Sequence, residues 1–305
     1  MRVALLAGGT GGTKLAHGFS MLPDVELTVI ANVGDDAVVH GHLVCPDIDA
    51  LLYTLSDLLD TDRGWGVRND THTAHAMFER LGAATWFRIG DADLATHAHR
   101  AGLLAAGAGL TDAVAAMATA LGIGARILPA SDEPHRTMIE TDEGSLEFQE
   151  YFVRLRQEPE VRGVSFEGAA RATDAVLAAI DAADLIVIGP SNPIVSIGPI
   201  LALPGIEETL QAADAPVVAV SPIIAGKALK GPADRMLASL GHDSTALGVA
   251  RLYDGLVRQF VIDEQDAALA GEIESQTAMA VAVLPTVMRS DDDRASLARS
   301  LLDLA

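Results

Sequence analysis

The feature that most constrains the fold is a run of glycines between an apolar strand and a helical pattern. Residues Val3–Ala7 are continuously apolar, and four glycines fall within Gly8–Gly12. Glycines let backbone N–H groups approach an anion, and a helix N-terminus adds positive partial charge. The run is neither G-x-G-x-x-G nor a P-loop, because Lys14 does not follow at the required spacing. The turn predicts an α/β protein that binds phosphate, with a ligand-free tight turn as the alternative.

Short apolar runs alternate with helical patterns along the chain. The expected strands are Val3–Ala7, Leu27–Val33, Leu185–Gly189, Val217–Ser221, Phe260–Ile262 and Ala280–Leu284. The expected helices are Lys14–Leu22, Asp47–Leu59, Thr111–Leu121, Ala169–Ala182, Pro199–Gln211 and Asp291–Leu304. This alternation predicts a Rossmann-like α/β fold, a mostly parallel sheet with helices on both faces. One domain over residues 1–305 is expected, with an inserted helical and hairpin region at about 95–165 that turns at Asp142-Glu143-Gly144.

The charge balance limits the possible partners. The chain has 42 acidic and 21 basic residues, a formal net charge of −21. Such a surface repels nucleic acid and anionic membranes, so we expect neither as a partner. Cys45 is the single cysteine, which excludes an internal disulfide and fits a reducing compartment. The N-terminus shows no signal-peptide pattern, and no apolar run reaches the length that spans a bilayer. A cytoplasmic protein is therefore expected.

Acidic residues follow the second strand and begin the next helix. Asp35 and Asp36 end the run Asn32-Val33-Gly34-Asp35-Asp36, and Asp47 and Asp49 lie in Cys45-Pro46-Asp47-Ile48-Asp49. The carboxyl ends of parallel strands share one edge of the sheet, where ligands collect. Carboxylate oxygens suit Mg²⁺ shared with substrate phosphates, so Asp35 and Asp47 predict a split metal site. A ribose contact, a solvated loop or a simple helix cap are the alternatives.

Later loops add polar and aromatic groups at comparable places. Trp65, between two glycines, could stack on a planar ring, and Arg88 could pair with a phosphate or a ring oxygen. Ser191, Asn192 and Ser196 follow a strong strand beside fixed prolines. No G-x-S-x-G or H-E-x-x-H motif occurs. The layout favours positioning and charge neutralisation, which is most of what phosphoryl transfer requires of a protein.

Seven motifs in this order resemble those of the 2-phospho-L-lactate transferase family. They span residue 3 to about 250 and are Gly8-Gly9-Thr10-Gly11, Asn32-Val33-Gly34-Asp35-Asp36, Pro46-Asp47-Ile48-Asp49, Arg63-Gly64-Trp65-Gly66, Gly90-Asp91-x-Asp93-Leu94-Ala95-Thr96-His97, Pro190-Ser191-Asn192-Pro193 and Ser221-Pro222-Ile223-Ile224. Any one motif alone is weak, whereas the ordered series is specific.

The resemblance implies a transferase in the biosynthesis of the deazaflavin coenzyme F(420). Such enzymes pass 2-phospholactate or phosphoenolpyruvate from its guanosine-diphosphate adduct to the ribityl hydroxyl of 7,8-didemethyl-8-hydroxy-5-deazariboflavin, releasing GMP. Family members use Mg²⁺ and are commonly homodimers. The family also has relatives of the same superfamily that bind nucleotide-sugars without catalysis. Three segments resemble the transferases and so argue against such a non-catalytic regulator: Arg63–Gly66, Asp91–His97 and Phe148–Glu150. The imperfect glycine pattern argues against an NAD-dependent oxidoreductase.

Carried over by position, the resemblance assigns roles to individual residues. Asp35 and Asp47 match the metal-binding acids, and Asp49 matches a deazaflavin contact that orients or deprotonates the attacking hydroxyl. The expected catalytic residues are these three acids. Arg88, Trp65 and Asp91 are the other expected deazaflavin contacts. The expected nucleotide contacts are Gly8, Gly9, Thr10, Gly11, Gly12, Thr13, Lys14, Ser191, Asn192, Pro193 and Ser196. Ala92 departs from the family, which often has a basic residue there.

Overall fold

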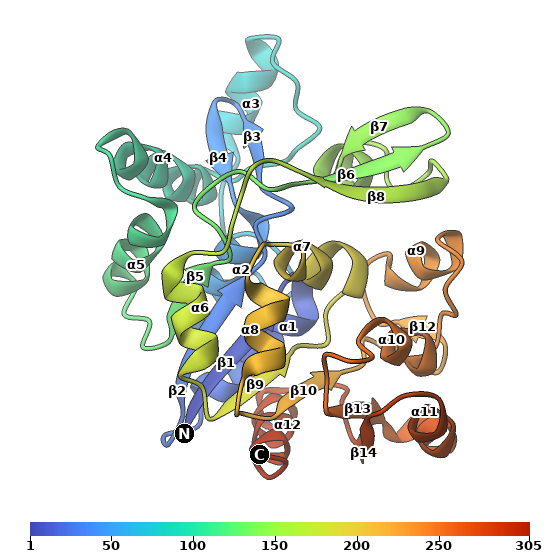
Figure 1. Cartoon of the computed structure of the whole chain (residues 1–305). Coiled ribbons are helices and arrows are strands. Elements are labelled where there is room, and N and C mark those ends of the chain that lie inside the picture. Colours follow the sequence, from blue (N-terminus) through green and yellow to red (C-terminus); the bar gives the residue numbers. More distant parts are fainter.

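The centre of the molecule is one sheet of seven strands that all run parallel (Figure 1). The computed structural model describes all residues, 1–305. The strands of this sheet are β1 (Arg2–Ala7), β2 (Glu26–Ala31), β5 (Arg126–Pro129), β9 (Leu185–Ile188), β10 (Val217–Val220), β13 (Gln259–Asp263) and β14 (Ala280–Leu284). Their order across the sheet is β14-β13-β10-β9-β1-β2-β5. The predicted Rossmann-like α/β fold with a parallel sheet is confirmed.

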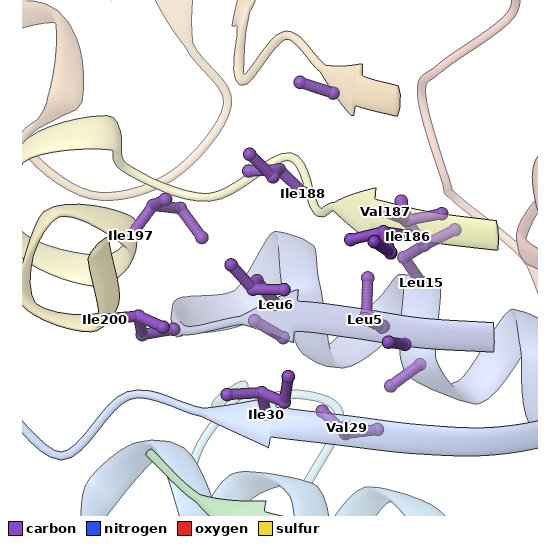
Figure 2. Packing of buried hydrophobic residues seen from close by; sticks show 14 of the residues in the cluster. Leu5, Leu6, Leu15, Val29, Ile30, Ile186, Val187, Ile188, Ile197 and Ile200 are labelled. Carbon is purple, nitrogen blue, oxygen red and sulfur yellow. The ribbon is translucent and has the colours of Figure 1, made fainter. Parts of the chain in front are cut away.

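The central strands are continuous apolar runs because helices cover both faces of the sheet. Leu5 of β1 lies opposite Val29 of β2 and Val187 of β9, and none of the three is exposed to solvent. Figure 2 shows these side chains packed together with Ile197 and Ile200 from the segment after β9. The main core cluster has 63 buried residues drawn from both ends of the chain. Burial of this apolar material drives the sheet to form.

The chain reverses its direction of travel across the sheet between β1 and β9. From β1 it moves to β2 and then β5, whereas from β9 it moves the other way to β10, β13 and β14. Right-handed crossovers then place helices on both faces of the sheet. Helix α1 (Gly9–Ser20) packs against α2 (Pro46–Leu55) and against α12 (Asp291–Leu302). Helices α6 (Asp174–Asp181) and α8 (Ile206–Ala212) pack against each other. In Figure 1, α6 and α8 lie in front of the sheet and α1 behind it.

Two expected helices differ from the structure in an informative way. Helix α1 begins at Gly9 rather than Lys14, so the glycine run forms the first turn of the helix itself. The expected helix Pro199–Gln211 is broken, because Gly205 adopts a left-handed φ of +94° before α8. The first piece is α7 (Gly198–Leu201).

The expected insertion at about 95–165 is not one continuous region. Strand β5 lies inside it and pairs with β2 in the central sheet. The excursion before β5 carries β3 (Ala37–Val39), β4 (His42–Val44), α2, α3 (Thr73–Arg80), α4 (Asp91–Ala105) and α5 (Leu110–Ala120). The excursion after β5 is a small antiparallel sheet of β6 (Arg136–Thr141), β7 (Gly144–Glu147) and β8 (Val161–Glu167), with the short helix η1 (Glu150–Arg154). The expected hairpin around Asp142-Glu143-Gly144 is confirmed as β6–β7.

The remaining elements follow β9 and β10. They are the short helices η2 (Pro193–Ile197) and η3 (Glu264–Leu269), the strands β11 (Ile223–Ile224) and β12 (Lys227–Ala228), and the helices α9 (Ala233–Ser239), α10 (Ala246–Leu252) and α11 (Ala270–Gln276). None of the chain's helices combines the length and apolar character that crossing a bilayer requires.

Candidate active site

Two loops meet at the switch point between β1 and β9, where ligands bind in open parallel sheets. The glycine turn follows β1, and the Ser191 loop follows β9. The Gly8 amide donates to Ser191 Oγ over 3.5 Å. A Cβ at Gly11 would lie 1.9 Å from the Pro190 carbonyl oxygen, so only glycine permits this approach. The structure thus brings together the two segments that were predicted to hold the nucleotide.

The first turn of α1 faces the acidic residues. Gly9 has a φ of +62°, and its amide donates to Asp47 Oδ1 over 2.6 Å. The next amides of a helix have no acceptor within the helix, which leaves Thr10 and Gly11 able to donate to an anion. A Cβ at Gly9 would lie 3.6 Å from Ser196 Oγ, so the Ser196 hydroxyl lies next to the first turn of α1. The turn therefore offers donors on one side and a carboxylate on the other.

Asn32 joins the two predicted metal acids. Its side chain is fully buried, and Nδ2 donates to Asp35 Oδ1 over 3.1 Å and to Asp47 Oδ2 over 2.9 Å. Its Oδ1 accepts the Gly34 amide over 2.7 Å, which fixes the turn that carries Asp35. Asn32 was not among the predicted site residues, although its place in Asn32-Val33-Gly34-Asp35-Asp36 was the available signal.

Asp35 and Asp47 form a buried pair of carboxylates, with exposed fractions of 9% and 6%. Burial and the neighbouring Asp47 raise the pKa of Asp35 well above its ordinary value. Burial also raises the pKa of Asp47, although hydrogen bonds from Gly9 and Asn32 oppose this. Such a pair needs a proton or a cation to offset its charge.

The oxygen donors of this pair fit Mg²⁺. No group of three or more His, Cys, Asp or Glu side chains has metal-binding geometry. Mg²⁺ is commonly bound by one or two carboxylates together with waters and substrate phosphates. Asp35 and Asp47, placed beside the α1 amides that can donate hydrogen bonds to phosphate, match that arrangement. The metal role of these residues stays a prediction.

Asp49 lies two residues beyond Asp47 in α2 and belongs to a different cluster. It is 4% exposed, its Oδ2 accepts the Cys45 amide over 3.1 Å, and its Oδ1 pairs with Arg100 Nη2. Arg100, which is fully buried, was not predicted. Next to this cluster Asp36 Oδ1 is buried without a hydrogen-bond partner, and burial raises the pKa of Asp36 well above its ordinary value.

The predicted deazaflavin contacts outside α2 lie in the segment that leads to α4. Trp65 is 44% exposed, and the Arg63 guanidinium lies 5.5 Å from its ring centroid. Arg88 is exposed and forms no ion pair in the chain. Both side chains are accessible to a ligand, and their role stays a prediction.

Asp91 has a structural role that the sequence did not indicate. Its carboxylate accepts the Thr71 hydroxyl over 2.5 Å and the Thr73 and Ala74 amides over 3.0 and 2.9 Å. These three donors hold the pKa of Asp91 at about 2. In return Asp70, in the loop before α3, accepts the Ala92 and Asp93 amides, so Asp91 caps α3 and Asp70 caps α4. This geometry supports an anchoring role for Asp91 in place of the predicted substrate contact.

Replacing Asp91 by alanine is expected to free α3 from α4. Limited proteolysis should then cut the segment between residues 63 and 90 severalfold faster, because two hydrogen bonds to the first amides of α3 and one to the loop residue Thr71 are lost. Asp112→Ala is the matched control, since Asp112 is also an acid in a first helical turn. Equal cleavage rates in the Asp91 variant and the wild-type protein would contradict the anchoring role.

Some predicted nucleotide contacts are already engaged within the chain. Thr13 Oγ1 donates to the Gly9 carbonyl over 2.8 Å, and Lys14 Nζ donates to the Met288 carbonyl over 2.8 Å. Asn192 caps η2 by accepting the Ile194 amide, and Pro193 is the buried first residue of that helix. Thr13, Lys14, Asn192 and Pro193 therefore shape the two loops, whereas Thr10, Gly11 and Ser196 border the open side.

Comparison with known proteins agrees with the motifs. The model of the family described as 2-phospho-L-lactate transferase CofD matches residues 3–292. The 2-phospho-L-lactate transferase of Methanosarcina mazei is 43% identical over 267 residues, covering 87% of this chain and 88% of that protein. The phosphoenolpyruvate transferase of Streptomyces griseus is 41% identical over 314 residues, covering 100% and 98%.

The fold also resembles a solved structure. A crystal structure of a UPF0052 family protein from Bacillus halodurans superposes with a TM-score of 0.67 at 18% identity, covering 99% of both chains. At that identity the likeness concerns the fold alone. The family match, by contrast, extends through the glycine turn, the acid pair and the Ser191 loop. The chain belongs to the 2-phospho-L-lactate transferase (CofD) family.

Proposed function

We propose that the chain transfers a phosphorylated three-carbon acid from its guanosine-diphosphate adduct to the ribityl hydroxyl of the deazaflavin, releasing GMP. One observation carries the proposal: the Gly9–Asp47 hydrogen bond joins the phosphate-binding turn to the acid pair at the sheet's switch point. The family and the names of the relatives favour a transferase in coenzyme F(420) biosynthesis over a non-catalytic nucleotide-sugar-binding regulator.

The reaction exchanges one phosphorus–oxygen bond for another. The hydroxyl oxygen of the deazaflavin bonds to the phosphorus that carries the acid, and the bond from this phosphorus to the bridging oxygen of the diphosphate breaks. GMP leaves with the bridging oxygen, and the hydroxyl proton is released. The protein's task in such a step is to align the two oxygens and to stabilise negative charge on the phosphates.

The glycine turn and the Ser191 loop bind the guanosine-diphosphate part of the donor, which contains the leaving GMP. The amides of Thr10 and Gly11 and the hydroxyl of Ser196 donate to the diphosphate, and the N-terminal end of α1 adds favourable potential. Close packing of Gly11 on Pro190 keeps the two loops together. These groups are in place before substrate binds, so little reorganisation opposes charge development.

Asp35 and Asp47 would hold Mg²⁺, and Asn32 donates a hydrogen bond to each of their carboxylates. When bound, Mg²⁺ would supply positive charge that offsets the charge of the diphosphate and of the two buried carboxylates.

Asp49 acts as an orienting acceptor for the deazaflavin in this proposal. Its Oδ1 is already engaged by the buried Arg100 guanidinium, which favours an orienting role over the alternative in which Asp49 removes the hydroxyl proton. Trp65 and Arg88 remain the accessible groups that could contact the ring of the same substrate.

The test is to incubate the purified protein with the deazaflavin, the guanosine-diphosphate donor and Mg²⁺ and to measure GMP. The expected result is GMP formation that requires the deazaflavin. Absence of GMP together with tight binding of a nucleotide-sugar would instead favour the regulator. A homodimer in the cytoplasm is part of the proposal on the strength of the family resemblance, and light scattering after gel filtration measures the oligomeric state.

A further inference from the structure

A set of buried polar side chains around Asp49 links α2 to α4. Arg100 on α4 is fully buried, and its Nη2 pairs with Asp49 Oδ1. Its Nη1 donates to the Leu43 carbonyl over 3.0 Å and lies 3.4 Å from Asp49 Oδ2. The guanidinium therefore holds both oxygens of the carboxylate and also the strand that precedes α2. Such a fork fixes orientation more strictly than a point charge does.

His97 continues the chain one helical turn before Arg100. Its ring is 1% exposed, with Nδ1 3.5 Å from Asp49 Oδ2 and Nε2 3.3 Å from Asp93 Oδ1. The Tyr53 hydroxyl donates to the same Asp93 oxygen over 2.6 Å. We call Tyr53, Asp93, His97, Asp49 and Arg100 the Asp49 network. Tyr53 and Asp49 lie on α2, and Asp93, His97 and Arg100 lie on α4, so the network joins the two helices.

The composition of the network opposes a purely stabilising role. The only buried residues of α4 are Asp93, His97 and Arg100, all of them polar or charged. Burying ions requires desolvation, and apolar side chains of similar size would anchor a helix at least as well. The three lie at helical spacing on one face, so α4 presents its buried face to Asp49. Positioning this carboxylate is therefore a better explanation of the network than anchoring α4.

The two oxygens of Asp49 are held unequally. Oδ1 is engaged by Arg100 Nη2, whereas Oδ2 has the Cys45 amide at 3.1 Å and longer contacts to Arg100 and His97. An ionised carboxylate offers about four acceptor sites, about two on each oxygen, so Oδ1, which has Arg100 Nη2 as its single donor, keeps capacity for a further donor. The network thus immobilises the carboxylate and leaves one oxygen available.

We propose that Arg100 and His97 are positioning residues that fix the carboxylate of Asp49 to accept a hydrogen bond from the deazaflavin. This inference rests on the proposed function and adds residues that contact no substrate themselves. Their effect is on deazaflavin binding, because the glycine turn and the acid pair on the nucleotide side are held by Asn32 and Gly9 instead.

The test measures KM for each substrate in Arg100→Lys and His97→Gln. Arg100→Lys keeps the charge but loses the fork, so it should fold while raising KM for the deazaflavin about ten- to a hundredfold. His97→Gln should raise the same KM by a smaller factor, and KM for the guanosine-diphosphate donor should stay within about twofold in both. Arg100→Met, which leaves Asp49 buried and unpaired, should be the most severe variant.

Two controls separate positioning from stability. Ile180→Ala removes a fully buried side chain from α6 and should lower the melting temperature without changing either KM. Tyr253→Phe removes a buried hydroxyl that has no partner, whereas Tyr53→Phe removes one that donates to Asp93. Only the Tyr53 variant should change KM for the deazaflavin.

Two outcomes would overturn the inference. In the first, Arg100→Lys and His97→Gln lower the melting temperature as Ile180→Ala does and leave KM for the deazaflavin unchanged. The second is a binding experiment that does not depend on turnover. If the wild-type protein forms no GMP, the proposed function is refuted, and deazaflavin binding is measured by fluorescence in the absence of the donor. Equal deazaflavin affinity of the wild-type and Arg100→Lys proteins would then refute the role of the Asp49 network.

Discussion

Replacing Asp47 by alanine is expected to lower kcat/KM for transfer by about a thousandfold or more while the fold is kept. The change removes one of two expected metal ligands, and loss of metal-centred charge stabilisation is worth several kcal/mol in the transition state. The fold should survive because Asp47 is a buried carboxylate beside Asp35, and burial raises the pKa of both. Removing one acid relieves their repulsion in the metal-free protein.

The measurement is GMP formation over a range of Mg²⁺ concentrations, together with the melting temperature. Mg²⁺ should raise the melting temperature of the wild-type protein, because a ligand that binds the folded state stabilises it, and should have no such effect in Asp47→Ala. Asp184→Ala is the matched control, because Asp184 accepts the Arg2 amide and side chain at the opposite end of β1. Full activity in Asp47→Ala would refute the metal assignment.

Replacing Gly11 by alanine is expected to be the most disruptive single-methyl change in the chain's binding loops. The new Cβ would lie 1.9 Å from the Pro190 carbonyl oxygen, which is backbone and cannot rotate away. The glycine turn and the Ser191 loop must then separate. We expect a loss of about 3 kcal/mol or more in stability, together with loss of donor binding. The midpoint of urea unfolding and the KM for the donor are the measurements.

The same substitution at Gly271 should have the opposite sign. Gly271 lies in α11, and a Cβ there meets nothing within 4 Å. Alanine favours a helix over glycine by roughly 1 kcal/mol, so Gly271→Ala should raise the urea midpoint slightly. A Gly11→Ala protein as stable as Gly271→Ala would show that the two loops do not depend on close contact.

The centre of the sheet could be predicted because its central strands are buried on both faces. Val3–Ala7, Leu185–Gly189 and Val217–Ser221 are uninterrupted apolar runs, which is typical of parallel strands under helices. Strand β5 was missed because Arg126–Pro129 is short, begins with a charge and ends with a proline that weakens the pattern. The expected insertion at about 95–165 therefore wrongly included β5, a strand of the central sheet.

The acid pair could be predicted from topology, whereas the Asp49 network could not. Asp35 follows β2 at the edge of the central sheet where ligands collect, and the separate β3–β4 hairpin returns the chain to Asp47 at the start of α2. Helix α4 has no apolar buried stripe, because its buried residues are Asp93, His97 and Arg100. A search for hydrophobic periodicity passes over such a helix.

Asn32 and Asp91 illustrate the same limit at the level of single side chains. The hydrogen bonds from Asn32 to both acids depend on its rotamer, which no spacing rule specifies. Asp91 lies in a motif shared with the transferase family, yet its carboxylate caps the helix that begins at Thr73. A motif identifies residues that matter to a family without stating what each one contacts.

The mass of the deazaflavin product tests the central claim most directly. Wild-type protein, Mg²⁺, the deazaflavin and the guanosine-diphosphate donor are incubated, and the deazaflavin fraction is analysed by mass spectrometry. The predicted result is a deazaflavin joined to the phosphorylated three-carbon acid, formed in equal amount to GMP. The phospholactate and phosphoenolpyruvate products differ by two hydrogens, so the same spectrum identifies the acid. Unmodified deazaflavin with GMP formed by hydrolysis alone, or with no GMP at all, would contradict a transferase.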